Sequence, residues 1–366
     1  MRRRLALVLD IDHTLLHAVV ARQGAEIPNE EVETFTLHGE LYSVKLRHHL
    51  AEFLLEAQQR YQIFLYTQGT RAYAEIIASI IDPEKKIIGG RIVSRTDTPE
   101  LDGAKSLDRI FLGDTRMVVV VDDREDVWRG IGRSQLLLVQ PFKYFAEGTD
   151  INNAPGALST SDDADDSQLQ HLLSALRDIH AAYYERVDDD ERRGGNQRLA
   201  HTSEIIAAMR STILRGCVLL CRKTEVRDII SQGLLKVAQM MGAEIAEAPD
   251  DRVTHLLCLE NPAAVFEIGV QLRDTSFFNS TCVINADWIR ACNWAMRRVD
   301  ENSFVLGYLE KKFLARIGTG VVLKPPQSRS LQKSNMSTFD EDDDEDQFMK
   351  EIEAGLEGMK EAKIDA

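Results

Sequence analysis

Two aspartates two residues apart, Asp10 and Asp12, come directly after the apolar residues 5–9. A short apolar run of this kind predicts a buried strand, and ligands bind beyond the carboxyl ends of strands in an open α/β sheet. One carboxylate can attack a phosphorus atom while the other protonates the leaving oxygen. Because two adjacent anions repel each other and a phosphate dianion, the pair also predicts a bound Mg²⁺. The alternative is an acidic turn that merely ends a strand.

Three other segments carry groups that suit the same chemistry. Thr67 lies just before a predicted helix, where hydroxyls and backbone N–H groups bind phosphate oxygens. Asp122 and Asp123 follow another apolar run and can complete a site for a hard cation, and Lys105 offers a positive charge to a phosphoryl group. Each signal alone is weak, because threonine often caps a helix and a lone lysine is usually solvated. Their order along one domain favours a common site.

The elements expected to position these residues form an α/β domain that covers residues 1–156. Four short apolar runs, bounded by polar or glycine-containing turns, predict strands buried on both faces, as in a parallel sheet. Two segments with apolar residues at three- and four-residue spacing predict helices between the strands. The predicted strands are residues 5–9, 63–66, 117–121 and 136–139, and the predicted helices are residues 48–59 and 71–81.

Three further regions are expected along the rest of the chain. Residues 157–198 combine an acidic loop with an amphipathic helical connector, and residues 199–318 form a second, smaller α/β domain. Residues 319–366 predict a disordered acidic tail, within which residues 347–360 have apolar side chains spaced as on one face of a helix. The second domain is predicted to contain strands at residues 217–221, 242–245, 253–259 and 281–284 and helices at residues 227–241 and around Trp288 and Trp294.

Composition argues against several classes of protein. The chain has 366 residues, of which 44% are hydrophobic, so it can form two or three domains with apolar cores. Its net charge of -15 lies mostly in residues 339–366, and we therefore expect no direct binding to nucleic acid. The apolar runs fall far short of the roughly 20 residues of a membrane span. The five cysteines include no CxxC pair, which argues against a zinc site or a disulfide framework.

The motifs of the first 185 residues resemble the haloacid dehalogenase superfamily. The Asp10-x-Asp12-x-Thr14 motif is shared by that whole superfamily. Two longer motifs, Thr-Arg-Ala-Tyr-Ala at residues 70–74 and Asp-Asp-Arg-Glu-Asp-Val-Trp at residues 122–128, are more particular. They resemble the FCP/SCP-like, TFIIF-associating phosphatases of the RNA polymerase II C-terminal domain. The resemblance implies a HAD-like Rossmannoid parallel sheet and a Mg²⁺-dependent, nuclear protein-serine phosphatase that acts on the phosphorylated polymerase tail.

The same resemblance implies roles for individual residues. Asp10 is expected to form an aspartyl-phosphate, and Asp12 to act as general acid and then as general base. Mg²⁺ would be bound by Asp10, the main-chain carbonyl of Asp12 and Asp123, with Asp122 supporting these ligands or sharing their role. The phosphoryl group would be held by Thr14, Thr67 and Lys105, and the substrate would be contacted by Arg71 and Arg95.

Segments of the second domain resemble a BRCT module, which follows the catalytic domain in the same phosphatase family. They are residues 214–217, 242–245, 253–258 and 287–289. We expect Trp288 to be a buried core residue. No lysine matches the position that binds phosphopeptides in some BRCT modules, so a role in positioning the polymerase tail is favoured over phosphopeptide capture.

The acidic tail resembles the family's C-terminal helix that docks on the large subunit of TFIIF. Helix-in-groove recognition requires only an apolar helix face and complementary charge, which residues 347–360 offer. The alternative is a solvated acidic tail without a partner.

Two other functions compete with a protein-serine phosphatase. A small-molecule phosphatase of the same superfamily usually carries an inserted cap domain, for which the segment between Thr70 and Ser106 leaves little room. A non-catalytic scaffold would bind phosphorylated partners through the BRCT-like domain, and its function would survive the loss of Asp10. The residue types at the catalytic positions favour the enzyme.

Overall fold

The computed structural model describes most of the two predicted folded domains and none of the tail. The predicted tail at residues 319–366 and its helix at residues 347–360 lie outside the described residues. Among the residues that are described, no helix is long and apolar enough to cross a membrane. The described ranges are residues 3–21, 32–101, 103–145, 166–194, 200–221, 226–247, 252–259 and 281–309.

A five-stranded parallel sheet forms the centre of the first domain, with strand order β6-β5-β1-β7-β8. Four of its strands were predicted, and the short edge strand β6 was not. The strands are β1 (Leu5–Leu9), β5 (Tyr61–Tyr66), β6 (Ile92–Val93), β7 (Val118–Asp122) and β8 (Leu136–Leu138). The predicted α/β class is therefore confirmed for this part of the chain.

The register of the three central strands determines where their polar ends lie. Leu9 of β1 pairs with Leu65 of β5 on one side and with Val121 of β7 on the other. All three strands run in the same direction, so the residues that follow them emerge at one edge of the sheet. The candidate residues of three distant segments are brought together in this way.

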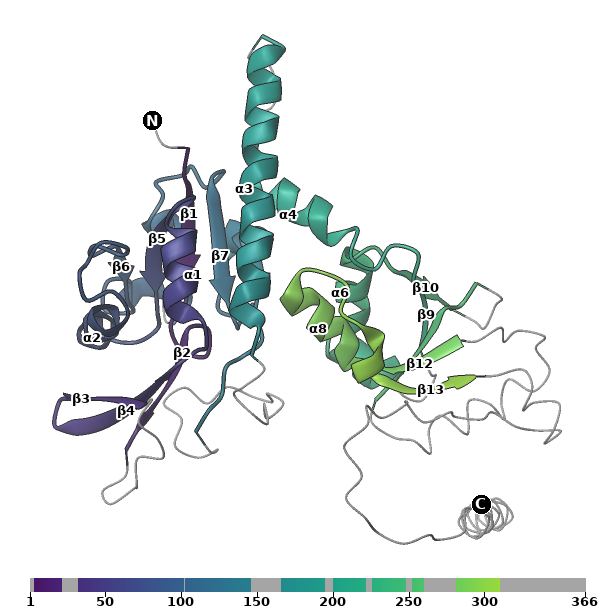
Figure 1. The fold of residues 1–366 in the computed structure, drawn as a ribbon, viewed down its shortest axis with the longest axis horizontal. Coiled ribbons are helices and arrows are strands. Elements are labelled where there is room, and N and C mark those ends of the chain that lie inside the picture. The colour runs from purple at the N-terminus through teal and green to yellow at the C-terminus, as the bar shows by residue number, and fades with distance from the viewer. Residues whose placement is uncertain are drawn as a thin grey trace, which may run out of the picture. The chain divides into compact units, whose positions relative to one another are not determined.

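Both faces of this sheet are buried, which explains the continuous apolar runs. Alternate residues of β1, such as Leu7 and Leu9, pack in a core with three helices, while Val8 packs on the other face with Tyr66 and Trp128. Helix α1 lies over the β1 and β5 strands in Figure 1. The three helices are α1 (Leu50–Ala57), α2 (Arg71–Ile81) and α3 (Gln168–Arg192).

A small antiparallel sheet, whose strands lie between β1 and α1 in the sequence, was not predicted. It has the strand order β2-β4-β3, and its hairpin of β3 and β4 is visible in Figure 1. Strand β3 is largely exposed, so its sequence lacks the apolar run by which the other strands were recognised. The strands are β2 (Leu16–Val20), β3 (Val32–Leu37) and β4 (Glu40–Leu46).

The second domain contains another five-stranded sheet, with strand order β10-β9-β11-β12-β13. Its first four strands are parallel and were predicted, whereas the antiparallel strand β13 was not. The smaller α/β domain that the sequence predicted is therefore present. The strands are β9 (Val218–Cys221), β10 (Glu244–Ala246), β11 (His255–Cys258), β12 (Thr281–Asn285) and β13 (Val305–Leu309).

The helices of the second domain differ from the prediction in two respects. Helix α4 (Thr202–Arg210) was not predicted. The helix expected at residues 227–241 is two helices, because Gly233 adopts a left-handed conformation with φ of 70° between them. Helix α8 was predicted correctly, and its Trp288 is fully buried as expected, with the indole N–H donating to the carbonyl of Val299 at 3.0 Å. The five cysteines are free thiols. The helices are α4 (Thr202–Arg210), α5 (Val226–Ser231), α6 (Leu234–Met240) and α8 (Asp287–Ala295).

Candidate active site

The carboxyl edge of the parallel sheet carries the predicted acidic residues. Asp10 follows β1, Asp122 is the last residue of β7, and Asp123 comes next in the chain. The backbone N–H of Asp10 donates to the carbonyl of Val121 at 2.9 Å, which extends the β1–β7 pairing to the site itself. The pairing of the two strands therefore fixes the backbones on which these carboxylates stand.

Lys105 is buried between two of these carboxylates. Its Nζ lies 2.5 Å from Oδ1 of Asp10 and 2.6 Å from Oδ2 of Asp122, and the residue is 2% exposed. Its backbone N–H donates to the carbonyl of Val127 at 2.7 Å. Burial alone would lower the pKa of Lys105, but the charges of Asp10 and Asp122 outweigh it and raise the pKa, so the ammonium is retained.

Asp12 is held by two hydroxyl groups. The phenol of Tyr73, in the first turn of α2, donates to one carboxylate oxygen at 2.5 Å, and Thr67 donates to the other at 3.4 Å. Burial raises the pKa of the Asp12 carboxyl, while these hydrogen bonds oppose the shift. Burial also raises the pKa of Tyr73, followed by the effect of Asp12, so the phenol remains a proton donor.

The neighbours Asp122 and Asp123 have different surroundings. Both oxygens of Asp122 are engaged, one by the backbone N–H of Arg124 at 2.8 Å and the other by Lys105 and the Trp128 indole at 2.9 Å. Asp123 is contacted by Thr14 at 3.5 Å through one oxygen, but its Oδ2 is buried without a hydrogen-bond partner. A buried carboxylate oxygen in this state is costly unless it binds a donor or a cation.

A divalent cation fits this group of carboxylates. One oxygen from each of Asp10, Asp122 and Asp123 lies within 4.8 Å of the others. Oxygen donors of this kind are those that Mg²⁺ prefers, and a cation would satisfy the unpartnered oxygen of Asp123. The pKa of Asp10 is raised well above its usual range, and that of Asp123 to about 7, first by burial and then by the charge of Asp122. The negative charge of the three carboxylates is thus greater than the positive charge that Lys105 supplies.

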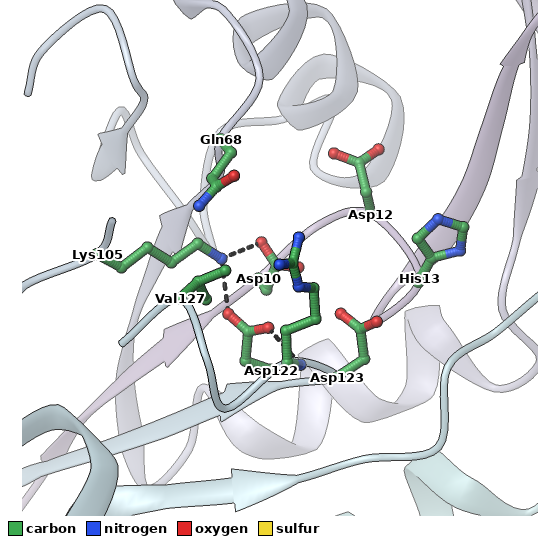
Figure 2. Close-up of a pocket in the computed structure, with 9 residues that line it drawn as sticks. Asp10, Asp12, His13, Gln68, Lys105, Asp122, Asp123 and Val127 are labelled. Carbon is green, nitrogen blue, oxygen red and sulfur yellow. Dashed lines mark hydrogen bonds and ion pairs between the residues drawn. The ribbon is translucent and has the colours of Figure 1, made fainter. Parts of the chain in front are cut away.

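These residues line an open pocket, shown in Figure 2. Its walls carry four carboxylates and two cations, with His13, Gln68 and Val127 completing the described lining. Asp10, Asp12, Asp122 and Asp123 supply the carboxylates, and Lys105 and Arg124 the positive charges. The pocket therefore combines a cluster of acids with space for a ligand at the edge of the sheet.

Four of the predicted site residues do not line this pocket. Thr67 is 1% exposed and accepts from the N–H of Gly69 at 2.9 Å besides donating to Asp12, while Thr14 is fully buried and accepts from the N–H of Asp123 at 3.1 Å. Thr14 therefore fixes the backbone of Asp123, and Thr67 that of Gly69. Arg71 is paired with Asp97 at 2.8 Å, and Arg95 is exposed on the loop that follows β6. Roles for these four side chains in binding phosphate or substrate remain predictions.

Six residues at the site were not singled out from the sequence. Four of them belong to the two particular motifs, where no local pattern indicates which side chain points inward: Tyr73, Arg124, Val127 and Trp128. Tyr73 is placed by the helix cap of Thr70, whose hydroxyl accepts from its N–H at 3.3 Å. The remaining two residues, His13 and Gln68, follow predicted site positions directly in the chain.

Comparisons with known proteins show which family the chain resembles. A family model of NLI interacting factor-like phosphatases matches residues 5–188. A phosphatase of the RNA polymerase II C-terminal domain from Caenorhabditis elegans is 30% identical over 322 residues, which are 83% of this chain and 46% of that protein. The phosphatase of the same name from Schizosaccharomyces pombe is 25% identical, over 83% of this chain and 58% of that protein. The chain thus spans about half the length of the curated relatives it matches.

Two solved structures are also similar. One is described as the structure of Fcp1, an essential RNA polymerase II CTD phosphatase; it matches with a TM-score of 0.67 and 29% identity, over 83% of this chain and 96% of that chain. The other is a variant of the fission yeast RNA polymerase II CTD phosphatase Fcp1 bound to beryllium fluoride, with a TM-score of 0.65 and 28% identity over the same shares. The family model covers half of the sequence and includes every residue of the pocket, and the chain belongs to the family of NLI interacting factor-like phosphatases.

Proposed function

We propose that this protein is a Mg²⁺-dependent protein-serine phosphatase that acts through an aspartyl-phosphate on Asp10. The observation that carries the proposal is the set of groups around the Asp10 carboxylate. Asp10 is paired with buried Lys105 at 2.5 Å, and it belongs to the same carboxylate cluster as Asp123, which has an unpartnered oxygen. Family membership supports the reaction class. The names of the relatives support the phosphorylated C-terminal domain of RNA polymerase II as the substrate.

In the first step, a carboxylate oxygen of Asp10 attacks the phosphorus of a phosphoserine. The bond from phosphorus to the serine oxygen breaks, and Asp12 donates a proton to that oxygen as general acid. Serine leaves with its hydroxyl restored, and the phosphoryl group stays on Asp10. The hydroxyls of Tyr73 and Thr67 hold the Asp12 carboxyl at distances of 2.5 and 3.4 Å, which restricts its orientation for this transfer.

In the second step, Asp12 is a carboxylate and takes a proton from a water molecule. The oxygen of that water attacks the phosphorus, the bond to Asp10 breaks, and inorganic phosphate is released. Asp12 therefore ends the cycle protonated, as it began. Lys105 keeps its charge throughout and stabilises negative charge on Asp10 and on the phosphoryl oxygens.

Asp10, Asp123 and the main-chain carbonyl of Asp12 are the proposed ligands of Mg²⁺. Asp122 is better suited to supporting them, because both of its oxygens already accept hydrogen bonds from other groups. When bound, the cation neutralises the carboxylates and polarises the phosphoryl group. Thr14 serves this arrangement by fixing the backbone of Asp123.

The proposed substrate is an extended phosphopeptide, because the pocket is open and the segment between Thr70 and Ser106 contains no cap domain among its described residues. Exposed Arg95 is proposed to contact the substrate, and Arg71 would first have to leave Asp97. Nuclear localisation and binding of the large subunit of TFIIF by residues 347–360 complete the proposal; the latter concerns residues outside those described.

Phosphate release from a doubly serine-phosphorylated polymerase-tail peptide tests this proposal. We expect release in the presence of Mg²⁺, none in the presence of a chelator, and none from Asp10→Asn, which retains the shape of the side chain but lacks the nucleophile. A panel of sugar and nucleotide phosphates serves as the control for substrate class. Release from that panel and not from the peptide would contradict the substrate proposal, and release by Asp10→Asn would contradict the mechanism.

A further inference from the structure

Two positively charged side chains line the pocket, and only one of them is accessible to an approaching ligand. Lys105 is 2% exposed and already lies between Asp10 and Asp122. The Arg124 side chain is 39% exposed and also lines the pocket. A phosphate dianion entering past four carboxylates meets strong repulsion, so a cation within its reach has a large effect on binding. Among the described lining residues, Arg124 is the one that meets this requirement.

Arg124 is fixed through its backbone, while its side chain is held only at the surface. The backbone N–H donates to Asp122 at 2.8 Å, which anchors the residue directly after the metal-site carboxylates. The guanidinium donates to both oxygens of Asp126, at 3.0 and 2.5 Å. With side chains 39% and 67% exposed, this ion pair contributes little net stability. The guanidinium can therefore change partners without disturbing the loop.

The planar guanidinium binds a phosphate group in the same two-pronged manner as a carboxylate, and a dianion attracts it more strongly. We propose that Arg124 is a substrate-binding residue that exchanges Asp126 for the phosphate group of the incoming phosphoserine. Asp126 holds the guanidinium at the mouth of the pocket and competes with the substrate for it. This inference deepens the proposed phosphatase function and rests on it for the identity of the ligand.

Direct binding separates this role from catalysis. The protein would be the full chain carrying Asp10→Asn, and the ligand a serine-phosphorylated polymerase-tail peptide titrated by calorimetry in the presence of Mg²⁺. Adding Arg124→Gln is expected to weaken binding about tenfold or more, as loss of a charge-assisted hydrogen bond does. The unphosphorylated peptide should bind equally to both proteins.

The competing role of Asp126 gives a prediction of opposite sign. Asp126→Asn releases the guanidinium and is expected to tighten binding by about threefold, an order of magnitude typical of a surface ion pair. Glu125→Gln removes the same charge from the neighbouring exposed residue and serves as the matched control for long-range electrostatics. The tightening by Asp126→Asn should exceed that by Glu125→Gln.

Two results would overturn the inference. One is an affinity of the Arg124→Gln protein for the phosphopeptide within twofold of that of its parent. The other is a loss of affinity in Asp126→Asn similar to the loss in Arg124→Gln, because Asp126 would then orient the arginine and not compete for it. Phosphate release by the wild-type protein is measured separately. Absence of release together with weakened binding in Arg124→Gln would refute the phosphatase proposal and retain the binding site.

Discussion

Asp122 and Asp123 are chemically identical neighbours whose surroundings assign them opposite effects on stability. Asp122 neutralises Lys105, which is buried with it, and accepts hydrogen bonds from two further donors. Asp123 adds a third negative charge with one oxygen unpartnered. A buried charge with its partner supports the fold, whereas a buried charge in excess opposes it until a cation binds.

Replacing each aspartate by asparagine should separate these effects. Asp122→Asn leaves Lys105 with one carboxylate, and we expect the free energy of unfolding to fall by about 3 kcal/mol. Asp123→Asn relieves repulsion, and we expect it to raise the free energy of unfolding by about 1 kcal/mol when Mg²⁺ is absent. Urea denaturation at pH 8 in chelator measures both changes.

Magnesium titration provides the second half of this prediction. Asp123→Asn should weaken Mg²⁺ affinity by at least about tenfold. Loss of a residue that only hydrogen-bonds to a metal ligand already has an effect of that size, and Asp123 is a proposed ligand itself. The wild-type protein should gain more stability from added Mg²⁺ than the variant does, since only binding to the folded state stabilises. An Asp123→Asn protein that is destabilised in chelator and binds Mg²⁺ normally would refute these roles.

At the scale of elements, the parallel strands were predictable because they are buried on both faces. Their apolar runs are continuous, and the polar residues that follow Leu9 and Val121 mark the edge at which ligands bind. The small sheet of β2, β3 and β4 could not be found in this way, since β3 is mostly exposed and its pattern reflects pairing with β4. Such strands form because they pair with a neighbouring strand, and their own sequence pattern does not indicate that pairing.

The site was predictable to the same extent and for a related reason. Carboxylates at strand ends are positioned by the backbone, so Asp10 and Asp122 could be placed from the sequence. Tyr73 reaches Asp12, and Arg124 reaches the pocket, through side-chain direction, which depends on packing around α2 and on the turn after β7. The wrongly predicted single helix at residues 227–241 has a local cause, because Gly233 permits the left-handed backbone that ends α5 and starts α6.

Two glycines of the second domain test how strictly the turns define its elements. An added Cβ at Gly233, where φ is 70°, meets open space, whereas at Gly242, where φ is 90°, it would lie 2.1 Å from the carbonyl oxygen of Ser211. We expect Gly233→Ala to lower the free energy of unfolding by about 1 kcal/mol, the strain of a left-handed alanine. Gly242→Ala should cost about 3 kcal/mol or more, because backbone must move as well.

Thermal or urea denaturation of the two variants measures this difference, and each serves as the other's control. Both have the same change of side chain and a similar φ, so only the steric surroundings differ. Equal losses in the two proteins would show that the contact with Ser211 is relieved by small shifts. Phosphate release should remain at the wild-type level in Gly233→Ala, which lies outside the parallel sheet of the active site.

At the scale of the whole molecule, stability should depend on pH through a buried histidine in the second domain. His255 is 5% exposed, with its ring stacked on Trp288 at a centroid distance of 5.0 Å. Burial, followed by the charge of Arg298, lowers the pKa of His255 to about 4, against a weaker opposing effect of Glu301. The imidazole is therefore neutral in the folded protein at pH values where it is charged in the unfolded chain.

The sign of the effect follows from proton binding. Between pH 6.5 and about 4 the unfolded chain holds a proton on His255 that the folded protein lacks, so the free energy of unfolding falls as the pH falls through this window. The loss approaches on the order of 3 kcal/mol and is complete below pH 4. His255→Phe keeps a flat ring against Trp288 and removes the titration.

Urea denaturation of both proteins from pH 7.5 to 4 tests this expectation. The catalytic carboxylates are common to the two proteins, so their contribution cancels in the difference between the two free energies of unfolding. As the pH falls, the wild-type protein should lose more stability than His255→Phe does. Thr254 keeps its bonds to Val218 when the imidazole is removed, which limits the cost of the substitution at neutral pH. A difference that stays constant across this range would show that His255 gains its proton equally in the folded and unfolded states, and would refute this expectation.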